Sequence, residues 1–227
     1  MSSLSASWHH PFRLLIALPL LLVMAACSGQ AVQPNIPVTG LVTPLPGQAT
    51  QPDPTQASSG AAALACKVSS GPAKLTPAVT EGPFFKAGSP ERAALVESGT
   101  AGQKLTLTGY VVTADCQPVA HALLDFWQAN AQGQYDNTGY SLRGHQFTDK
   151  NGRYQLETIV PGLYPGRTEH IHVKVQAPGG PLLITQLFFP GVADNQSDGI
   201  YDPALLVKLQ ASGSPWQARY DFVISAK

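Results

Sequence analysis

The feature that most constrains the fold of this chain is a series of short segments in which apolar and polar residues alternate. The segments cover residues 104–112, 122–130, 153–160, 170–177, 181–189 and 218–225. Alternation with a period of two is typical of β-strands that bury one face. The Gly, Pro, Asn and Asp residues between the segments indicate turns. The pattern predicts an all-β domain, a single β-sandwich with long loops and short helices.

Helix signals are few in the same region. Residues 89–98 offer Ser89 as a cap and Pro90 in the first turn, and residues 202–209 offer Asp202 and Pro203 in the same roles. We therefore expect short helices at these two places. The length of the region leaves little room for a second domain.

The first residues have the pattern of a bacterial lipoprotein signal peptide, which we expect to occupy residues 1–27. Arg13 precedes an apolar stretch, residues 14–24, that is too short to span a bilayer. The sequence VMAAC resembles a lipobox, with Met24 in the place of the usual leucine. It predicts cleavage before Cys27 and lipidation of its sulfur. The alternative is an ordinary signal peptide with an incidental cysteine.

Residues 28–65 are rich in Pro, Gln, Thr and Gly, nearly uncharged, and without an amphipathic period. Such a composition predicts a disordered linker, and the alternative is an ordered arm in short pieces of it. We therefore expect an exported lipoprotein, periplasmic or at the cell surface. Its N-terminal lipid would anchor the domain of residues 66–227 to a membrane.

The number of cysteines is consistent with an exported protein. If Cys27 is lipidated, Cys66 and Cys116 remain as an even pair in an oxidising compartment, which predicts a disulfide. Closing a loop of that length would stabilise the fold by roughly 4 kcal/mol in the chain-entropy model. Two buried free thiols are the alternative.

The charged residues do not indicate a polyanionic partner. The chain has 14 basic and 14 acidic residues, and in the folded region they are interspersed rather than gathered into a basic stripe. We therefore expect no nucleic-acid partner.

Two histidines separated by one residue form the candidate chemical site. His170 and His172 share one face of the strand predicted over residues 170–177, while Ile171 and Val173 face the core. Two imidazoles on one face are half of a metal site. The same pattern also occurs on sheet surfaces that bind nothing.

Tyr164 is the remaining candidate ligand near the histidines, because the cysteines are expected to pair and no carboxylate lies at motif spacing. A phenol, whose ordinary pKa is about 10, ionises at neutral pH only beside a highly charged cation. Zn(II) favours thiolate or carboxylate instead. A His/His/Tyr set therefore indicates non-haem Fe(III). Neutralising that ion with one hydroxide requires two phenolates, which predicts a second tyrosine.

Five segments together resemble the intradiol ring-cleavage dioxygenases, the family of protocatechuate 3,4-dioxygenase and catechol 1,2-dioxygenase. They are TEGPFF, DFWQANAQGQY, TDKNGRYQLETIVPG, YPGRTEHIH and ITQLFFPG, and they occur in the order of the family. The resemblance runs from about Leu75 to about Gly191. It implies an enzyme that uses Fe(III) and O₂ to cleave a small aromatic diol of the catechol type. The bond broken lies between the two hydroxyl-bearing carbons, and the product is a muconate-type diacid.

The resemblance also implies roles for individual residues. The iron ligands of the family fall on two tyrosines and two histidines, which are Tyr135, Tyr164, His170 and His172. The residues expected to take part in catalysis are Arg167, Gln186 and the exchangeable ligand Tyr164. The residues expected around the substrate ring are Gly82, Pro83 and Trp127.

Two departures from the family limit what carries over. After Gly82 and Pro83 the family commonly has a tyrosine, whereas this sequence has Phe84. A hydroxyl near the substrate is therefore missing, and protocatechuate does not carry over as the substrate. The linker stands where the family has a helical dimerisation segment, so the oligomeric state does not carry over either.

A second interpretation is a non-catalytic, transthyretin-like β-sandwich that acts as a binding module of the cell envelope. The segment TDKNGRYQLETIVPGLY also fits such modules, with Tyr164 as a core residue. This interpretation explains the fold but gives no common role to His170, His172, Arg167 and Tyr135.

Overall fold

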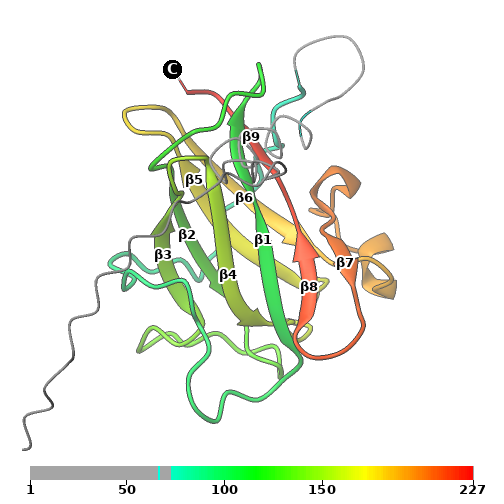
Figure 1. Cartoon of the computed structure of the whole chain (residues 1–227). Coiled ribbons are helices and arrows are strands. Elements are labelled where there is room, and N and C mark those ends of the chain that lie inside the picture. Colours follow the sequence, from blue (N-terminus) through cyan, green and yellow to red (C-terminus); the bar gives the residue numbers. More distant parts are fainter. Residues whose placement is uncertain (1–65, 67–72, 227) are drawn as a thin grey trace, which may run out of the picture. The chain divides into compact units, whose positions relative to one another are not determined.

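The computed structural model describes Cys66 and residues 73–226 as a two-layer β-sandwich (Figure 1). The predicted signal peptide, Cys27 and the linker lie outside the described residues. The elements are β1 (Lys104–Thr113), β2 (Leu123–Gln128), β3 (Arg143–Phe147), β4 (Arg153–Ile159), β5 (His170–Gln176), β6 (Leu182–Phe188), the 3-10 helices η1 (Ala193–Gln196) and η2 (Pro203–Leu205), β7 (Lys208–Gln210), β8 (Trp216–Arg219) and β9 (Phe222–Ile224). None of the helices in this part of the chain has the length and apolar character needed to span a membrane. The predicted all-β sandwich is confirmed.

The two sheets differ in how their strands run. The first has the order β4-β1-β8-β7, and β1 is antiparallel to β4 but parallel to β8 and to β9. The second has the order β3-β2-β5-β6 and is antiparallel throughout. Alternate apolar side chains of both sheets, such as Leu156 of β4 and Val173 of β5, are fully buried between the two layers. Burying side chains of this size stabilises the fold by about 1.5–3 kcal/mol each.

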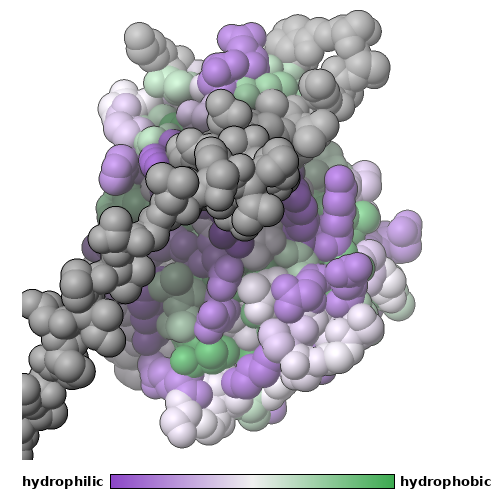
Figure 2. Space-filling model, in the orientation of Figure 1, coloured by the Kyte–Doolittle hydropathy of each residue, from purple (hydrophilic) through white to green (hydrophobic). Residues whose placement is uncertain are grey.

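The outer faces of the two sheets are not alike. In β4, buried Tyr154 and Leu156 alternate with exposed Arg153 and Gln155, so the outer face of the first sheet meets solvent. Figure 2, in the orientation of Figure 1, shows hydrophilic residues interspersed with apolar ones on the visible part of this side. In β5, by contrast, residues 170–173 are buried on both faces. Loops therefore cover the outer face of the second sheet, which is the face that carries the two histidines.

The predicted helix at residues 89–98 is wrong. Its backbone pairs instead with β3 and β4, because Arg92 N donates to a β3 carbonyl and Leu95 N donates to a β4 carbonyl, each over 2.8 Å. Both strands lie at the end of their sheet in the strand order, so the segment satisfies backbone groups that would otherwise lack partners. The Ser89 hydroxyl does not cap a helix and donates to Asp125 Oδ1 over 2.8 Å.

Other predicted elements differ in extent. The helix expected at residues 202–209 is a single turn, capped by the Asp202 carboxylate, which accepts from Ala204 N over 2.8 Å. It ends at Leu205, and the chain then enters β7. The strand expected at residues 218–225 is divided into β8 and β9. β3 was not predicted from the sequence, because its residues Arg-Gly-His-Gln-Phe do not alternate apolar and polar side chains.

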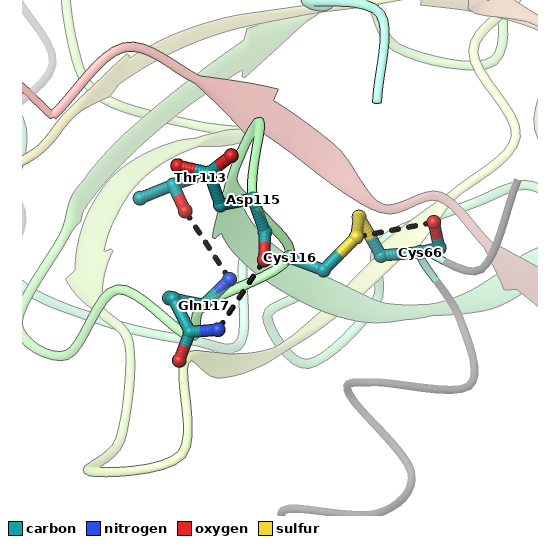
Figure 3. Close-up of a disulfide and its surroundings, with 5 residues drawn as sticks. All are labelled: Cys66, Thr113, Asp115, Cys116 and Gln117. Carbon is teal, nitrogen blue, oxygen red and sulfur yellow. Dashed lines mark hydrogen bonds between the residues drawn. A yellow bond between two sulfur atoms is a disulfide. The ribbon is translucent and has the colours of Figure 1, made fainter. Parts of the chain in front are cut away.

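The disulfide joins Cys66 to Cys116, the pair expected from the sequence (Figure 3). Cys116 lies in the turn that follows β1, and the two cysteines are 50 residues apart in the chain. Cys66 packs with Tyr110 and Val112 of β1 in a small cluster separate from the main core. The bond thus fixes Cys66 to the first sheet.

Candidate functional site

Four side chains form one row across the outer face of the second sheet. Arg143 of β3 lies opposite Trp127 of β2, Trp127 lies opposite His172 of β5, and His172 lies opposite Gln186 of β6. Residues that face each other in register point to the same side of a sheet. All four are almost completely buried, with at most 2% of their surface exposed. The side chains of the site therefore come from strands, and loops cover them.

The two histidines bring their Nε2 atoms close together. His170 Nδ1 donates to the Thr168 carbonyl over 2.6 Å, which leaves Nε2 free to bind a cation. His170 Nε2 lies 3.1 Å from His172 Nε2. Burial lowers the pKa of His170 to about 4 and lowers that of His172 well below its ordinary value. Both rings are therefore neutral at neutral pH, the form in which histidine binds metals.

Tyr135 completes a group of three close donor atoms. Its phenol oxygen lies 3.1 Å from His170 Nε2. The ring of Tyr164 lies beside it, with centroids 6.0 Å apart and planes nearly perpendicular. Phe84 stacks on Tyr135 at 4.3 Å and meets Tyr164 edge-on at 5.2 Å. The four residues expected from the sequence to be ligands thus lie close together, and Phe84 contacts both tyrosines.

The loops that carry the two tyrosines pack backbone against backbone. Gly162 N donates to Asn130 O over 2.9 Å. A Cβ on Gly133, which has a φ of +75°, would lie 1.9 Å from the Leu163 carbonyl oxygen. Glycine at position 133 is therefore required for the two loops to approach each other. This contact fixes the positions of the two loop segments that lead into Tyr135 and Tyr164.

The donor set fits a ferric ion. His172 Nδ1 is buried without a hydrogen-bond partner among the described residues, and His172 Nε2 meets only another imidazole nitrogen and so is poorly satisfied by the protein alone. No group of three His, Cys, Asp or Glu side chains forms a metal site in the described ranges, so a site here depends on tyrosine. Burial raises the pKa of Tyr135, and a trivalent cation beside the phenol would reverse that shift.

Arg167 is held at the edge of this group by two partners. Its Nε donates to Asp198 Oδ2 over 2.9 Å, and its Nη2 donates to Gln186 Oε1 over 2.6 Å. Burial alone would raise the pKa of Asp198, but bonds from Ile200 N, Thr168 N and Arg167 outweigh it and leave that pKa below its usual value. The Arg167 guanidinium is thus fixed by an ionised carboxylate.

The segment of residues 80–85 covers the row of side chains. Gln186 Nε2 donates to Thr80 O over 2.9 Å, and a Cβ on Gly82 would lie 3.3 Å from His172 Cε1. Phe85 meets Trp127 edge-on at 5.0 Å, and Trp127 stacks on the His172 ring at 4.8 Å. Gly82 and Trp127, expected near the substrate, both contact the candidate ligand His172. Pro83 shares a cavity of about 420 Å³ with Phe84, Phe85, Lys86, Asn137 and Arg143.

A second cavity has the candidate ligand Tyr164 in its lining. It has a volume of about 480 Å³, and its lining includes Tyr164, Arg167 and Asp198. A single aromatic ring with two hydroxyls is small enough to enter it. Sequence reasoning missed Asp198, Thr168 and Arg143, which orient the other residues, because none of them stands in a spacing that indicates chemistry.

Comparison with known proteins gives consistent matches. The family model described as Dioxygenase matches residues 80–225. The solved dioxygenase domain of a dioxygenase carbohydrate-binding protein fusion from Streptomyces sp. SirexAA-E is 52% identical, with a TM-score of 0.66, and the match covers 68% of this chain and 100% of that chain. The 3-chlorocatechol 1,2-dioxygenase of Rhodococcus opacus 1CP is 31% identical, with a TM-score of 0.61, over 65% of this chain and 72% of that chain.

Two relatives match over a smaller share of their own length. The hydroxyquinol 1,2-dioxygenase of Rhizobium sp. (strain MTP-10005) is 29% identical over 185 residues, which is 63% of this chain and 63% of the relative. The catechol 1,2-dioxygenase of Acinetobacter baylyi is 32% identical over 155 residues, which is 56% of this chain and 50% of the relative. The chain thus spans between half and two thirds of these relatives.

Proposed function

This chain belongs to the intradiol ring-cleavage dioxygenase family, and on that premise we propose that it cleaves the ring of a catechol-type aromatic with O₂. The bond broken lies between the two hydroxyl-bearing carbons, and the product is a muconate-type diacid. The relatives described above are named for catechol, 3-chlorocatechol and hydroxyquinol. A small aromatic diol is therefore the substrate class that we assign to this chain.

One observation carries the proposal. The Tyr135 phenol oxygen and the Nε2 atoms of His170 and His172 make successive contacts of 3.1 Å, beside the ring of Tyr164. A binding module has no need for two neutral imidazoles and two phenols around one point. This donor set suits Fe(III), which when bound supplies Lewis-acid activation of the diol.

Individual residues around the donor set have separate roles. Thr168 O keeps the proton of His170 on Nδ1, so that Nε2 stays available to the metal. Tyr164 lines the 480 Å³ cavity, where, ionised as a metal ligand, its phenolate oxygen would accept a proton from an entering diol and become a neutral phenol. Arg167, fixed by Asp198 and Gln186, stabilises negative charge on the substrate ring.

The proposal is tested by oxygen uptake with iron-loaded protein. We expect catechol, chlorocatechol or hydroxyquinol to consume one O₂ per molecule and to yield a ring-opened diacid, identified by mass spectrometry. The iron-loaded protein is expected to absorb visible light through tyrosinate-to-Fe(III) charge transfer. Protein that binds iron yet neither absorbs there nor consumes O₂ with any of these diols would contradict the proposal and favour the binding module.

We also propose, from the sequence alone, that the protein is an exported lipoprotein anchored through Cys27. The test is expression of the full chain in bacteria fed labelled palmitate. The wild type is expected to incorporate label and to sediment with membranes, and Cys27→Ala to do neither. A soluble, unlabelled wild type would contradict the anchor and leave the enzymatic proposal untouched.

A further inference from the structure

Arg143 is a buried cation that makes no ion pair among the described residues, since the carboxylates of Asp136 and Asp125 attract it only from a greater distance. Its residue surface is 1% exposed, and no carboxylate oxygen of the described chain lies within 4.0 Å of its guanidinium. Burying an unpaired charge costs several kcal/mol unless hydrogen bonds satisfy it. Here main-chain carbonyl oxygens do so. An arginine kept at such a cost calls for an explanation other than stability.

The carbonyls that Arg143 binds belong to two segments of the site. Its Nη1 donates to Phe84 O over 2.7 Å, 59 residues away in the chain. Its Nε and Nη2 donate to Asp136 O over 3.1 and 2.9 Å, seven residues away. Phe84 ends the segment that covers His172, and Asp136 directly follows the candidate ligand Tyr135. One guanidinium therefore joins the covering segment to the loop that carries a ligand.

The row across the second sheet explains why position 143 can do this. Gln186 and Arg143 stand at its two ends and hold the covering segment at Thr80 O and Phe84 O, respectively. Gly82, between these two points, packs on His172. The segment is thus fixed at both ends, and the Arg143 end also fixes Tyr135.

Two further cations hold the same loop from nearer the surface. Lys86 Nζ donates to Thr138 O and Gly139 O, and Arg92 Nη2 donates to Tyr140 O. Residues 129–142 contain no helix or strand, so side-chain donors take the place of regular hydrogen bonding. Of the three cations, Arg143 alone is almost fully buried and alone reaches Phe84.

We propose that Arg143 is a positioning residue for ring cleavage. It fixes Tyr135 relative to residues 82–84 and so sets where the phenol oxygen of this candidate ligand lies relative to His170. Arginine suits this task because its planar fork donates in two directions at once, which the single ammonium of lysine does not. The proposal rests on the proposed function, since the position of Tyr135 matters for ring cleavage only if the chain performs it.

The first test uses metal-free protein and amide hydrogen exchange. Arg143→Lys keeps the charge but loses the fork. We expect the amides of Gly82, Gly139 and Ser141, which bond to nearby side chains, to exchange about 10-fold faster or more. Arg153→Lys, the same change at an exposed position of β4, is the matched control and should leave these amides unchanged.

The second test uses iron-loaded protein. If Arg143 positions Tyr135, Arg143→Lys should shift the tyrosinate-to-Fe(III) band and lower kcat/KM for catechol by about 100-fold, the scale expected for a misplacement near 1 Å. A merely structural role would lower the melting temperature without moving the band. An unchanged band together with unchanged exchange would overturn the proposal.

A second variant, Lys86→Met, keeps the proposal testable if Arg143→Lys does not fold. Lys86→Met releases the same loop from a partly exposed position, and Gly139 and Ser141 should then exchange faster while Gly82 stays protected by the Arg143 link. An equal loss of protection from hydrogen exchange at all three amides would contradict a separate role for Arg143. If wild-type protein consumes no O₂ with any catechol, the proposed function fails, whereas the exchange experiment still reports whether Arg143 couples the two segments.

Discussion

At the scale of single residues, the site depends on how each side chain is oriented by a neighbour. Thr168 O selects the proton position on His170, and Asp198 and Gln186 together fix the plane of the Arg167 guanidinium. Groups of this kind act through hydrogen bonds rather than by touching the substrate. Their removal should therefore change the chemistry more than the fold.

Tyr135→Phe tests the second phenolate. The change removes one oxygen from the donor set and keeps the ring that stacks on Phe84. We expect weaker iron retention against a chelator, by about 10-fold or more, and the loss of part of the visible absorption. Tyr140→Phe is the control, because its hydroxyl donates to Ala87 O away from the candidate ligands. Unchanged iron retention in Tyr135→Phe would remove this residue from the ligand set.

Asp198→Asn tests how Arg167 is held. The amide keeps the shape but loses the charge that accepts from Arg167 Nε and Thr168 N. We expect kcat/KM to fall by about 10-fold to 100-fold with iron content retained. Asp194→Asn, in the same cavity but without a bond to Arg167, should have little effect. Equal losses in the two variants would mean that the cavity's charge matters rather than the position of Arg167.

The sequence points to the candidate ligands more readily than to the residues that orient them. His170 and His172 follow from period-two alternation, and Tyr135 follows from the need for a second phenolate together with family resemblance. Asp198 contacts Arg167 across 31 residues of the chain, and Arg143 contacts Phe84 across 59. No local pattern marks such a partner, because its neighbours in the sequence do not contribute to the contact.

At the scale of elements, the position of the tyrosines depends on two loops rather than on strands. The loop before Tyr135 and the loop before Tyr164 meet at Gly133 and Gly162, where each glycine faces the backbone of the other loop. A side chain at either point would separate the loops. The candidate site is thus held together partly by the absence of side chains at these two positions.

Gly133→Ala tests this contact. The added Cβ would meet the Leu163 carbonyl at 1.9 Å, and a φ of +75° is itself unfavourable for alanine. We expect a loss of stability of about 3 kcal/mol or more, with reduced iron content. Gly191→Ala, at a φ of +80° with open space around it, isolates the conformational cost and should lose only about 1–2 kcal/mol. Equal melting temperatures of the two variants would contradict the loop contact.

The errors in predicting elements have physical causes. Residues 89–98 carry helix signals, yet their backbone is used to pair with two edge strands, because open strand edges outweigh a single cap. β3 lacks apolar alternation because its core-facing positions, opposite Phe126 and Leu124 of β2, are held by Gly144 and Gln146.

At the scale of the whole molecule, the sandwich separates stability from chemistry. The core lies between the sheets, the candidate site lies on the outer face of the second sheet, and the disulfide is attached to the first sheet. The disulfide contributes no side chain to the candidate site. Its effect should therefore be confined to stability.

Replacing both Cys66 and Cys116 by serine tests this separation. The bond closes a loop of 50 residues, so its loss should cost roughly 4 kcal/mol and lower the melting temperature by about 10 °C, with iron binding retained. A reductant should lower the melting temperature of the wild type to the same value and leave the variant unchanged. Loss of iron from the folded variant would show that the disulfide supports iron binding as well as stability.

The central claim is that two phenols and two imidazoles surround one ferric ion in the loop-covered face of the second sheet. Anomalous diffraction at the iron absorption edge, from crystals of the iron-loaded protein, tests it most directly. We predict one peak within bonding distance of the phenol oxygens of Tyr135 and Tyr164 and of Nε2 of His170 and His172. A peak elsewhere, or one that Tyr135 does not reach, would contradict the account.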